Sequence, residues 1–244
     1  TGMITDKDGN KLSKSKGNAL SLEEAGKQYG IDILRYYYSN LPTWFNQPFD
    51  EKLLRMPKNE LRIFYNSMNY VKTYLQLLNF NKKEIKEKDD YSKWIISRLT
   101  KTILKATNEL KTKNHREAII TIKEFFMDDF SRTYIKLIRP KLKNNYKGKD
   151  QESIMQTLYE IALKTLQLMS PFTPFLCEEI YQTFFKKYEE QESIHLKNWP
   201  KINKNKINED LEKEFEIATM IIENVLNMRA KQGIKTRWPL NMVE

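Results

Sequence analysis

The sequence of 244 residues has few of the side chains that build disulfides and closed metal sites. It contains one cysteine, Cys177, and two histidines, His115 and His195. This set cannot form an internal disulfide, and it does not supply a closed zinc site. Such sparing use of cysteine is typical of a reducing compartment, so we expect a cytoplasmic protein without a bound metal.

Long apolar runs are also missing. No stretch approaches the roughly 18 to 20 apolar residues that span a membrane, and the first residues show no basic segment followed by an apolar one. We therefore expect neither a membrane protein nor a targeted one. The chain starts at Thr1, directly before a turn-rich segment, from which we expect a piece of a longer protein.

Basic residues are abundant, with 42 Lys and Arg against 32 Asp and Glu and a net charge of +10. Such an excess favours a polyanionic partner. However, 33 of the 42 basic residues are Lys, and Asn and Ile are frequent, which is the usage that an AT-rich genome imposes on any protein. The charge alone leaves a nucleic-acid partner open.

Helical periodicity dominates after residue 20, where no run of alternating strand residues occurs. Ser21 is the expected N-cap of a helix that continues towards Tyr38, with Glu24 as its capping-box partner. A linker containing Pro42 and Pro48 follows. Apolar stripes then run from Leu53 to Leu75, Trp94 to Leu110, Ala118 to Leu137, Ile154 to Met169 and Leu176 to Tyr188, and a last helix is expected from Asp210 to Lys231. The pattern predicts an all-α protein, an up-and-down helix bundle preceded by a short loop-helix segment.

The segment from Lys11 to Asn18 reads KLSKSKGN and concentrates groups that suit a phosphate chain. Its three lysines supply ammonium charge, its two serines supply hydroxyl donors, and Gly17 permits positive φ before the next helix. Ammonium groups of this kind can stabilise charge that moves during nucleotidyl transfer. The residue types alone favour an ordinary Lys- and Ser-rich surface turn over a phosphate site.

Order and context resolve this ambiguity. The segment resembles the KMSKS signature of class I aminoacyl-tRNA synthetases, with Leu12 at the position of Met, and residues 29–35 (YGIDILR) resemble the family's Gly-x-Asp segment. The resemblance implies ATP and Mg²⁺ as cofactors. It also implies that Lys11 and Lys14 are catalytic and that Lys11, Ser13, Lys14 and Ser15 bind ATP. The family's other signature, His-x-Gly-His, does not occur in this sequence.

Later segments resemble the members that charge branched aliphatic amino acids: residues 93–99 (KWIISRL), 170–174 (SPFTP) and 237–240 (RWPL). Residues 130–140 (FSRTYIKLIRP) resemble the isoleucyl members more than the valyl ones, and among these the archaeal and eukaryotic type. The resemblance implies part of an isoleucine–tRNA ligase that forms isoleucyl-adenylate from ATP and isoleucine and charges tRNA(Ile) as a monomer. A valyl, leucyl or methionyl relative is an alternative, and so is a stand-alone helical RNA-binding protein.

The resemblance also predicts how the chain is divided. Residues 1–48 would end the catalytic domain, residues 49–200 would form the helical anticodon-binding domain, and residues 201–244 would form a helix and the start of a further C-terminal segment. The amino-acid pocket and the editing domain lie upstream in the family. We therefore expect this chain alone to be inactive as an enzyme.

Three basic residues are the expected tRNA contacts. Arg132, Lys136 and Arg139 recur at spacings of four and three, which places them on one face of a regular helix. Lys141, Lys143, Lys147 and Lys149 would extend that face. It could also be a solvated surface, but the neighbouring charge favours contact with phosphates.

Other conspicuous residues have structural interpretations. We expect Trp94 in the core rather than as a platform for bases, His195 as a structural polar contact, and Cys177 as a buried, inert thiol.

Overall fold

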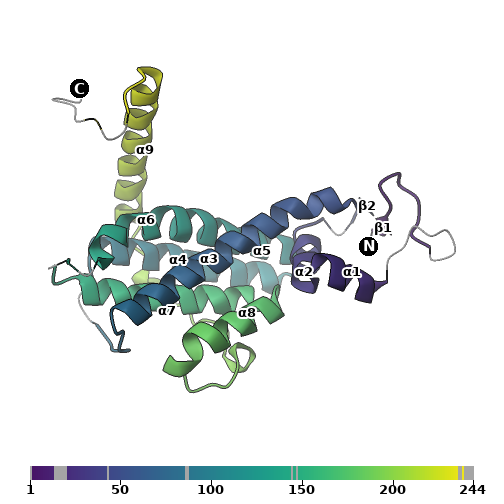
Figure 1. Cartoon of the computed structure of the whole chain (residues 1–244), viewed down its shortest axis with the longest axis horizontal. Coiled ribbons are helices and arrows are strands. Elements are labelled where there is room, and N and C mark those ends of the chain that lie inside the picture. The colour runs from purple at the N-terminus through teal and green to yellow at the C-terminus, as the bar shows by residue number, and fades with distance from the viewer. Residues whose placement is uncertain are drawn as a thin grey trace.

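The computed structural model describes residues 2–13, 21–42, 44–85, 88–143, 145, 146, 148–235 and 238. It confirms the all-α prediction, because helices pack around one large apolar core and only a small pair of strands lies at the N-terminal end (Figure 1). The main elements are β1 (Ile4–Thr5), α1 (Leu22–Tyr29), α2 (Ile31–Ser39), β2 (Gln47–Pro48), α3 (Arg55–Leu77), α4 (Asp90–Lys111), α5 (His115–Glu124), α6 (Ile135–Ile138), α7 (Gln151–Met169), α8 (Pro174–Ile180) and α9 (Glu209–Lys231). Shorter turns connect them: η2 (Glu51–Leu54), η3 (Phe125–Tyr134), η4 (Arg139–Leu142), η5 (Tyr181–Phe185), η6 (Lys186–Tyr188), η7 (Ile194–Leu196) and η8 (Lys204–Lys206).

The N-terminal helix starts as predicted but is interrupted. Ser21 and Glu24 form both hydrogen bonds of a capping box at the start of α1. The expected single helix then breaks at Gly30, whose φ of +88° lies in a region that side chains with a Cβ disfavour, so α2 starts anew at Ile31. The strands β1 and β2 pair in parallel, and no sequence signal predicts them because each is only two residues long.

The core lies between α3, α4, α5, η3 and α7. Phe64 of α3 meets Phe126 of η3 edge to face, with ring centroids 5.2 Å apart, and both rings are fully buried. Trp94 is 6% exposed, which confirms its predicted place in the core. These elements therefore share one continuous apolar core.

One stretch of the bundle is not a regular α-helix. Residues Phe125–Tyr134 form a π-helix, in which hydrogen bonds close wider i→i+5 turns. The positions without any exposed surface recur at four, through Phe126, Phe130, Tyr134 and Ile138. The predicted stripe ended instead at Leu137, which is only half-buried, because it assumed α-helical spacing throughout.

Helix α9 is confirmed, but it leaves the bundle and has no buried residue (Figure 1). Its first turns are attached: the ring of Phe215 stacks on Trp94 with centroids 5.0 Å apart, and Glu212 accepts hydrogen bonds from Ser97 and Lys101. Farther along, Ile222 is 53% exposed. No helix within the described ranges is long and apolar enough to cross a membrane.

Candidate nucleic-acid interface

The predicted ATP loop begins at a tight turn that the strands hold in place. Lys11 forms an antiparallel bridge with Thr5 of β1. Between them, one carboxylate oxygen of Asp6 accepts hydrogen bonds from the backbone N–H groups of Asp8 and Asn10, at 3.0 and 2.8 Å. Lys11 is exposed and Ser13 is half-buried. The other two predicted ATP ligands, Lys14 and Ser15, lie outside the described residues.

The segment after this loop is joined to the bundle by polar contacts. Asp32 of α2 accepts a hydrogen bond from the backbone N–H of Leu176 in α8, at 2.7 Å. Tyr36 of α2 donates a buried hydrogen bond of 2.9 Å to Glu60 of α3. Burial raises the pKa of the Asp32 carboxyl above its ordinary value, against the effect of the Leu176 hydrogen bond. The N-terminal segment and the bundle therefore form one connected unit.

The predicted tRNA contacts lie on three differently wound segments. Arg132 is in η3 and pairs with Asp128 at 2.6 Å, Lys136 is exposed on α6, and Arg139 starts η4 with its guanidinium 5.7 Å from the ring centroid of Tyr70. The prediction that these three residues share one face assumed a regular α-helix, but this stretch consists of a π-helix, a short α-helix and a 3-10 turn. Their contact with tRNA stays a prediction.

The predicted extension of this patch is smaller than expected. Lys141 pairs with Asp150 at 2.6 Å, so its charge is largely compensated within the protein. Lys143 and Lys149 are exposed. Lys147 lies outside the described residues.

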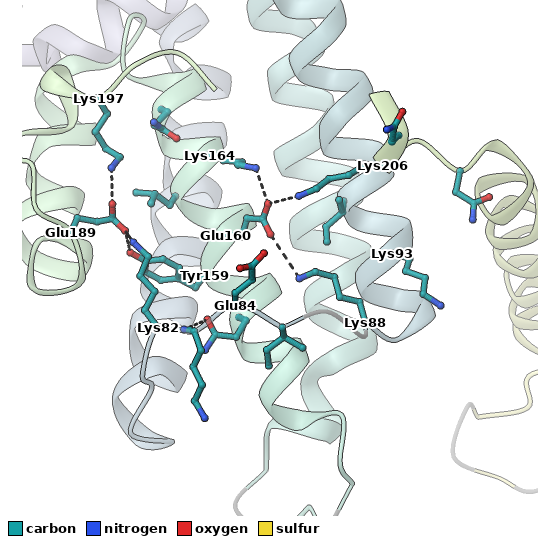
Figure 2. Close-up of a pocket in the computed structure, with 18 residues that line it drawn as sticks. Lys82, Glu84, Lys88, Lys93, Tyr159, Glu160, Lys164, Glu189, Lys197 and Lys206 are labelled. Atoms are coloured by element: carbon teal, nitrogen blue, oxygen red, sulfur yellow. Dashed lines mark hydrogen bonds and ion pairs between the residues drawn. The ribbon is translucent and has the colours of Figure 1, made fainter. Parts of the chain in front are cut away.

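A lysine-rich groove is the larger basic feature, and the sequence did not predict it (Figure 2). Its volume is about 890 Å³. The lining lysines are Lys82, Lys83, Lys88, Lys93, Lys164, Lys197 and Lys206. They come from the loop before α4, from α4 itself, from α7 and from the segment before α9, so no local run of basic residues marks the site.

Two carboxylates organise most of these lysines. Glu160 of α7 lies 2.7 Å from Lys164, 3.2 Å from Lys206 and 3.8 Å from Lys88. Burial opposes the ionisation of Glu160, but the lysines outweigh it and lower the pKa of the carboxyl. Glu189 is held in the same way by Lys82 and Lys197, each at 2.6 Å. Both carboxylates are therefore ionised at neutral pH.

The remaining conspicuous residues have structural roles. The ring of His195 contacts the carbonyl oxygen of Pro174 at 3.2 Å, and burial raises the pKa of the Cys177 thiol, so both interpretations made from the sequence are confirmed. Across the part of the chain that the structure describes, no group of three or more His, Cys, Asp or Glu side chains is placed to hold a metal ion.

Comparison with known protein families identifies the family of this chain. Residues 92–244 match the family described as the anticodon-binding domain of tRNA ligase, and residues 1–47 match tRNA synthetases of class I (I, L, M and V). The chain belongs to the class I tRNA synthetase family. The two matches follow one another in the order that the sequence motifs predicted.

Individual relatives cover the chain almost completely. An isoleucine–tRNA ligase from Pyrococcus horikoshii is 34% identical over 248 residues, which is 99% of this chain and 23% of that protein. An isoleucine–tRNA ligase from Methanosarcina barkeri is 32% identical over 255 residues, or 99% of this chain and 24% of that protein. The chain thus spans about a quarter of the length of these curated relatives.

A solved structure supports the fold. The crystal structure of the LeuRS–tRNA–LeuAMS ternary complex from Agrobacterium radiobacter K84 superimposes with a TM-score of 0.65. The match covers 85% of this chain and 24% of that chain, at 19% sequence identity. At this identity the likeness shows a shared architecture of the synthetase segment.

Proposed function

We propose that this chain is part of an isoleucine–tRNA ligase, which forms isoleucyl-adenylate from ATP and isoleucine and then charges tRNA(Ile). The observation that carries the proposal is the similarity of 99% of the chain, through both modules, to archaeal isoleucine–tRNA ligases. In this proposal residues 1–48 end the catalytic domain, residues 49–200 bind the anticodon arm, and residues 201–244 lead into a further segment.

The ATP contacts come from the loop that starts at Lys11. Lys14 and Lys11 supply ammonium groups to the nucleotide's phosphates, while Ser13 and Ser15 donate hydroxyl hydrogen bonds to them. Mg²⁺ enters with ATP, since this ion is usually bound by substrate phosphates together with one or two carboxylates. The turn at Asp6 to Asn10 supports the start of the loop, because its hydrogen bonds fix the backbone that leads into Lys11.

The tRNA contacts come from the helical domain. Arg132, Lys136 and Arg139 supply positive charge to the RNA backbone, and Arg139 is steadied by the ring of Tyr70. Phosphate contacts of this kind make binding depend on salt. Three such contacts would contribute about 2 to 3 to the slope at which the logarithm of the binding constant falls with the logarithm of salt concentration.

Binding of purified tRNA(Ile) to this chain, measured by fluorescence anisotropy over a range of salt concentrations, tests the RNA-binding part of the proposal. Changing Arg132, Lys136 and Arg139 together to Glu should abolish binding without loss of helicity. A matched control changes Lys52, Lys58 and Lys105 to Glu; these lysines are exposed and make no ion pair within the described residues. Equal losses in both variants would contradict a specific role for the first three residues.

The amino-acid identity needs a separate comparison. Valyl, leucyl and methionyl enzymes belong to the same matched family. Preferential binding of tRNA(Ile) over tRNA(Val), tRNA(Leu) and tRNA(Met) would favour the isoleucyl assignment. The parent open reading frame distinguishes a synthetase from a stand-alone RNA-binding protein, because only the synthetase requires an upstream His-x-Gly-His segment.

A further inference from the structure

The groove lined by α4, α7 and the segment before α9 contains uncompensated positive charge (Figure 2). Glu160 faces three ammonium groups, those of Lys88, Lys164 and Lys206, within 3.8 Å. One carboxylate neutralises one of them. This cluster therefore retains an excess of about two positive charges on side chains that ion pairs already hold in position.

A second cluster lies along the same groove. Glu189 has a side chain that is only 6% exposed, and it pairs with both Lys82 and Lys197 at 2.6 Å. The hydroxyl of Tyr159 also donates a hydrogen bond to this carboxylate. Glu189 again neutralises one of two ammonium groups, so the groove contains two separate positive centres.

Lys88 is a partly buried member of the first cluster. Burial is the main reason that its pKa is lowered; the charges of Lys206 and Lys164 act in the same direction, while the carboxylates of Glu160 and Asp89 raise it. The ammonium group also donates a hydrogen bond of 3.2 Å to the hydroxyl of Thr157. A bound anion would relieve the repulsion among the three lysines without requiring them to move far.

We propose that this groove binds the phosphodiester backbone of an RNA, with successive phosphates at the Glu160 cluster and at the Glu189 cluster. The inference rests on the proposed function, since it assumes that the helical domain binds tRNA. It names a second RNA surface, formed by residues other than Arg132, Lys136 and Arg139.

The shape and lining of the groove favour a polyanion over other ligands. Seven lysines line the groove against three glutamates, Glu84, Glu160 and Glu189, so its lining carries a net positive charge. A single small anion would occupy one positive centre, but a polymer with a charge on every repeat can meet both. Gln167, Asn205 and Asn208 also line the groove and offer amide groups to sugars and bases.

Changing Lys88, Lys164 and Lys206 together to Gln tests the proposal. The net charge of the cluster would change from about +2 to −1, so two phosphate contacts should be lost and the salt slope for tRNA binding should fall by about 1.4 to 1.8. At 0.1 M salt the affinity should fall by tenfold or more. The matched control changes the exposed Lys52, Lys58 and Lys105 to Gln, which removes the same number of lysines and should leave the slope nearly unchanged.

A measurement on the unmodified chain covers the case in which the triple variant folds poorly. Acetylation of lysines, followed by mass spectrometry, should show Lys88, Lys164 and Lys206 protected by tRNA and Lys52, Lys58 and Lys105 unprotected. Protection by inorganic tripolyphosphate but not by tRNA would assign the groove to a small anion and overturn the proposal.

The outcomes distinguish a failure of the groove as an RNA site from a failure of the proposed function. The groove would not be an RNA site if tRNA bound tightly and salt-dependently but the groove variant kept the same salt slope, or if tRNA did not protect these lysines. The proposed function would then remain intact. No binding of tRNA by the unmodified chain at low salt would refute both.

Discussion

The carboxylate of Asp32 in α2 accepts a hydrogen bond from the backbone N–H of Leu176, 2.7 Å away in the first turns of α8. Asp32 lies in the Gly-x-Asp segment that follows the predicted ATP loop, and Leu176 lies in the bundle, so this bond joins the two modules. Its other carboxylate oxygen is buried and has no hydrogen-bond partner within the described residues. The contact therefore stabilises the junction but leaves part of a charge poorly solvated.

Replacing Asp32 by Ala should lower the free energy of unfolding by about 1 to 3 kcal/mol, because the N–H of Leu176 would lose its acceptor. Asp32→Asn keeps an acceptor oxygen and removes the poorly solvated charge, whose cost shows in the raised pKa. The Asn variant should therefore lose much less of the free energy of unfolding at pH 7. Urea unfolding of the three proteins checks this ranking; an Asn variant as unstable as the Ala variant would show that the charge itself is needed.

The base of α9 depends on an aromatic contact. Phe215→Ala should loosen α9 from the bundle, because it removes the ring stacked on Trp94, a type of pair that contributes about 0.5 to 1.5 kcal/mol beyond its buried area. Hydrogen exchange of the α9 backbone amides should become faster while exchange in α7 stays unchanged. Ile222→Ala is the control, since Ile222 is 53% exposed and Ala favours helix. Equal exchange rates in both variants would argue against the stack as an anchor.

The stability of the bundle should depend on the ionisation of Glu189. Burial opposes this ionisation, but hydrogen bonds from Lys197, Lys82 and Tyr159 outweigh it, so the pKa lies below the ordinary value of 4.5. A depressed carboxyl pKa gives stability that is present above the unfolded-state pKa and is lost as pH falls through the folded-state value.

Glu189→Gln should therefore reduce the free energy of unfolding by about 2 kcal/mol or more at pH 7, and the difference from the unmodified chain should shrink below pH 4.5. Urea unfolding at pH 7, 4.5 and 3.5 measures this difference. A gap that stays constant over the whole range would mean that the side chain's shape, and not its charge, matters at this position.

The elements predicted best from the sequence were those that local rules determine. The capping box of Ser21 and Glu24, the end of the fourth apolar stripe at Met169 and the buried position of Trp94 each follow from spacing within a few residues. The π-helical stretch could not be predicted, because its wider turns conform to the packing of Phe126, Phe130 and Tyr134 against neighbouring helices. The ending of the third apolar stripe was wrong for this reason.

The two candidate sites also differ in whether local sequence could reveal them. The ATP loop is one continuous segment, so its residue order carried the signal. The lysine groove joins Lys88, Lys164 and Lys206 from segments far apart in the chain, which the packing of α4 against α7 and against η8 brings together. In a chain with 33 lysines, no individual lysine among them stood out.

The purified chain should not activate isoleucine. In the family to which it belongs, the adenylation step needs groups from the KMSKS-like loop and from the His-x-Gly-His signature around one ATP, and a rate advantage of this kind depends on joint positioning. Isoleucine-dependent exchange of pyrophosphate into ATP, measured against a blank without enzyme, should show no signal. Exchange above that blank would contradict the proposed division of the active site between this chain and another segment.

In the complete ligase that we propose, Lys14→Ala should slow adenylate formation far more than it weakens binding of isoleucine or tRNA. A lysine that meets the phosphates only as charge builds towards pyrophosphate release contributes to the transition state and little to the ground state, so its loss should appear in the rate constant. Removing one such preorganised contact typically costs about 2.7 to 4 kcal/mol, or about a hundred- to a thousandfold. Lys14→Arg should recover only part of the rate, because a planar guanidinium differs in reach and hydration from a compact ammonium.

Lys16→Ala is the internal control, since the signature gives Lys16 no phosphate contact. Pre-steady-state adenylate formation at saturating ATP and isoleucine compares the three variants, and a larger defect for Lys16→Ala than for Lys14→Ala would show that the chemistry belongs to the other lysine.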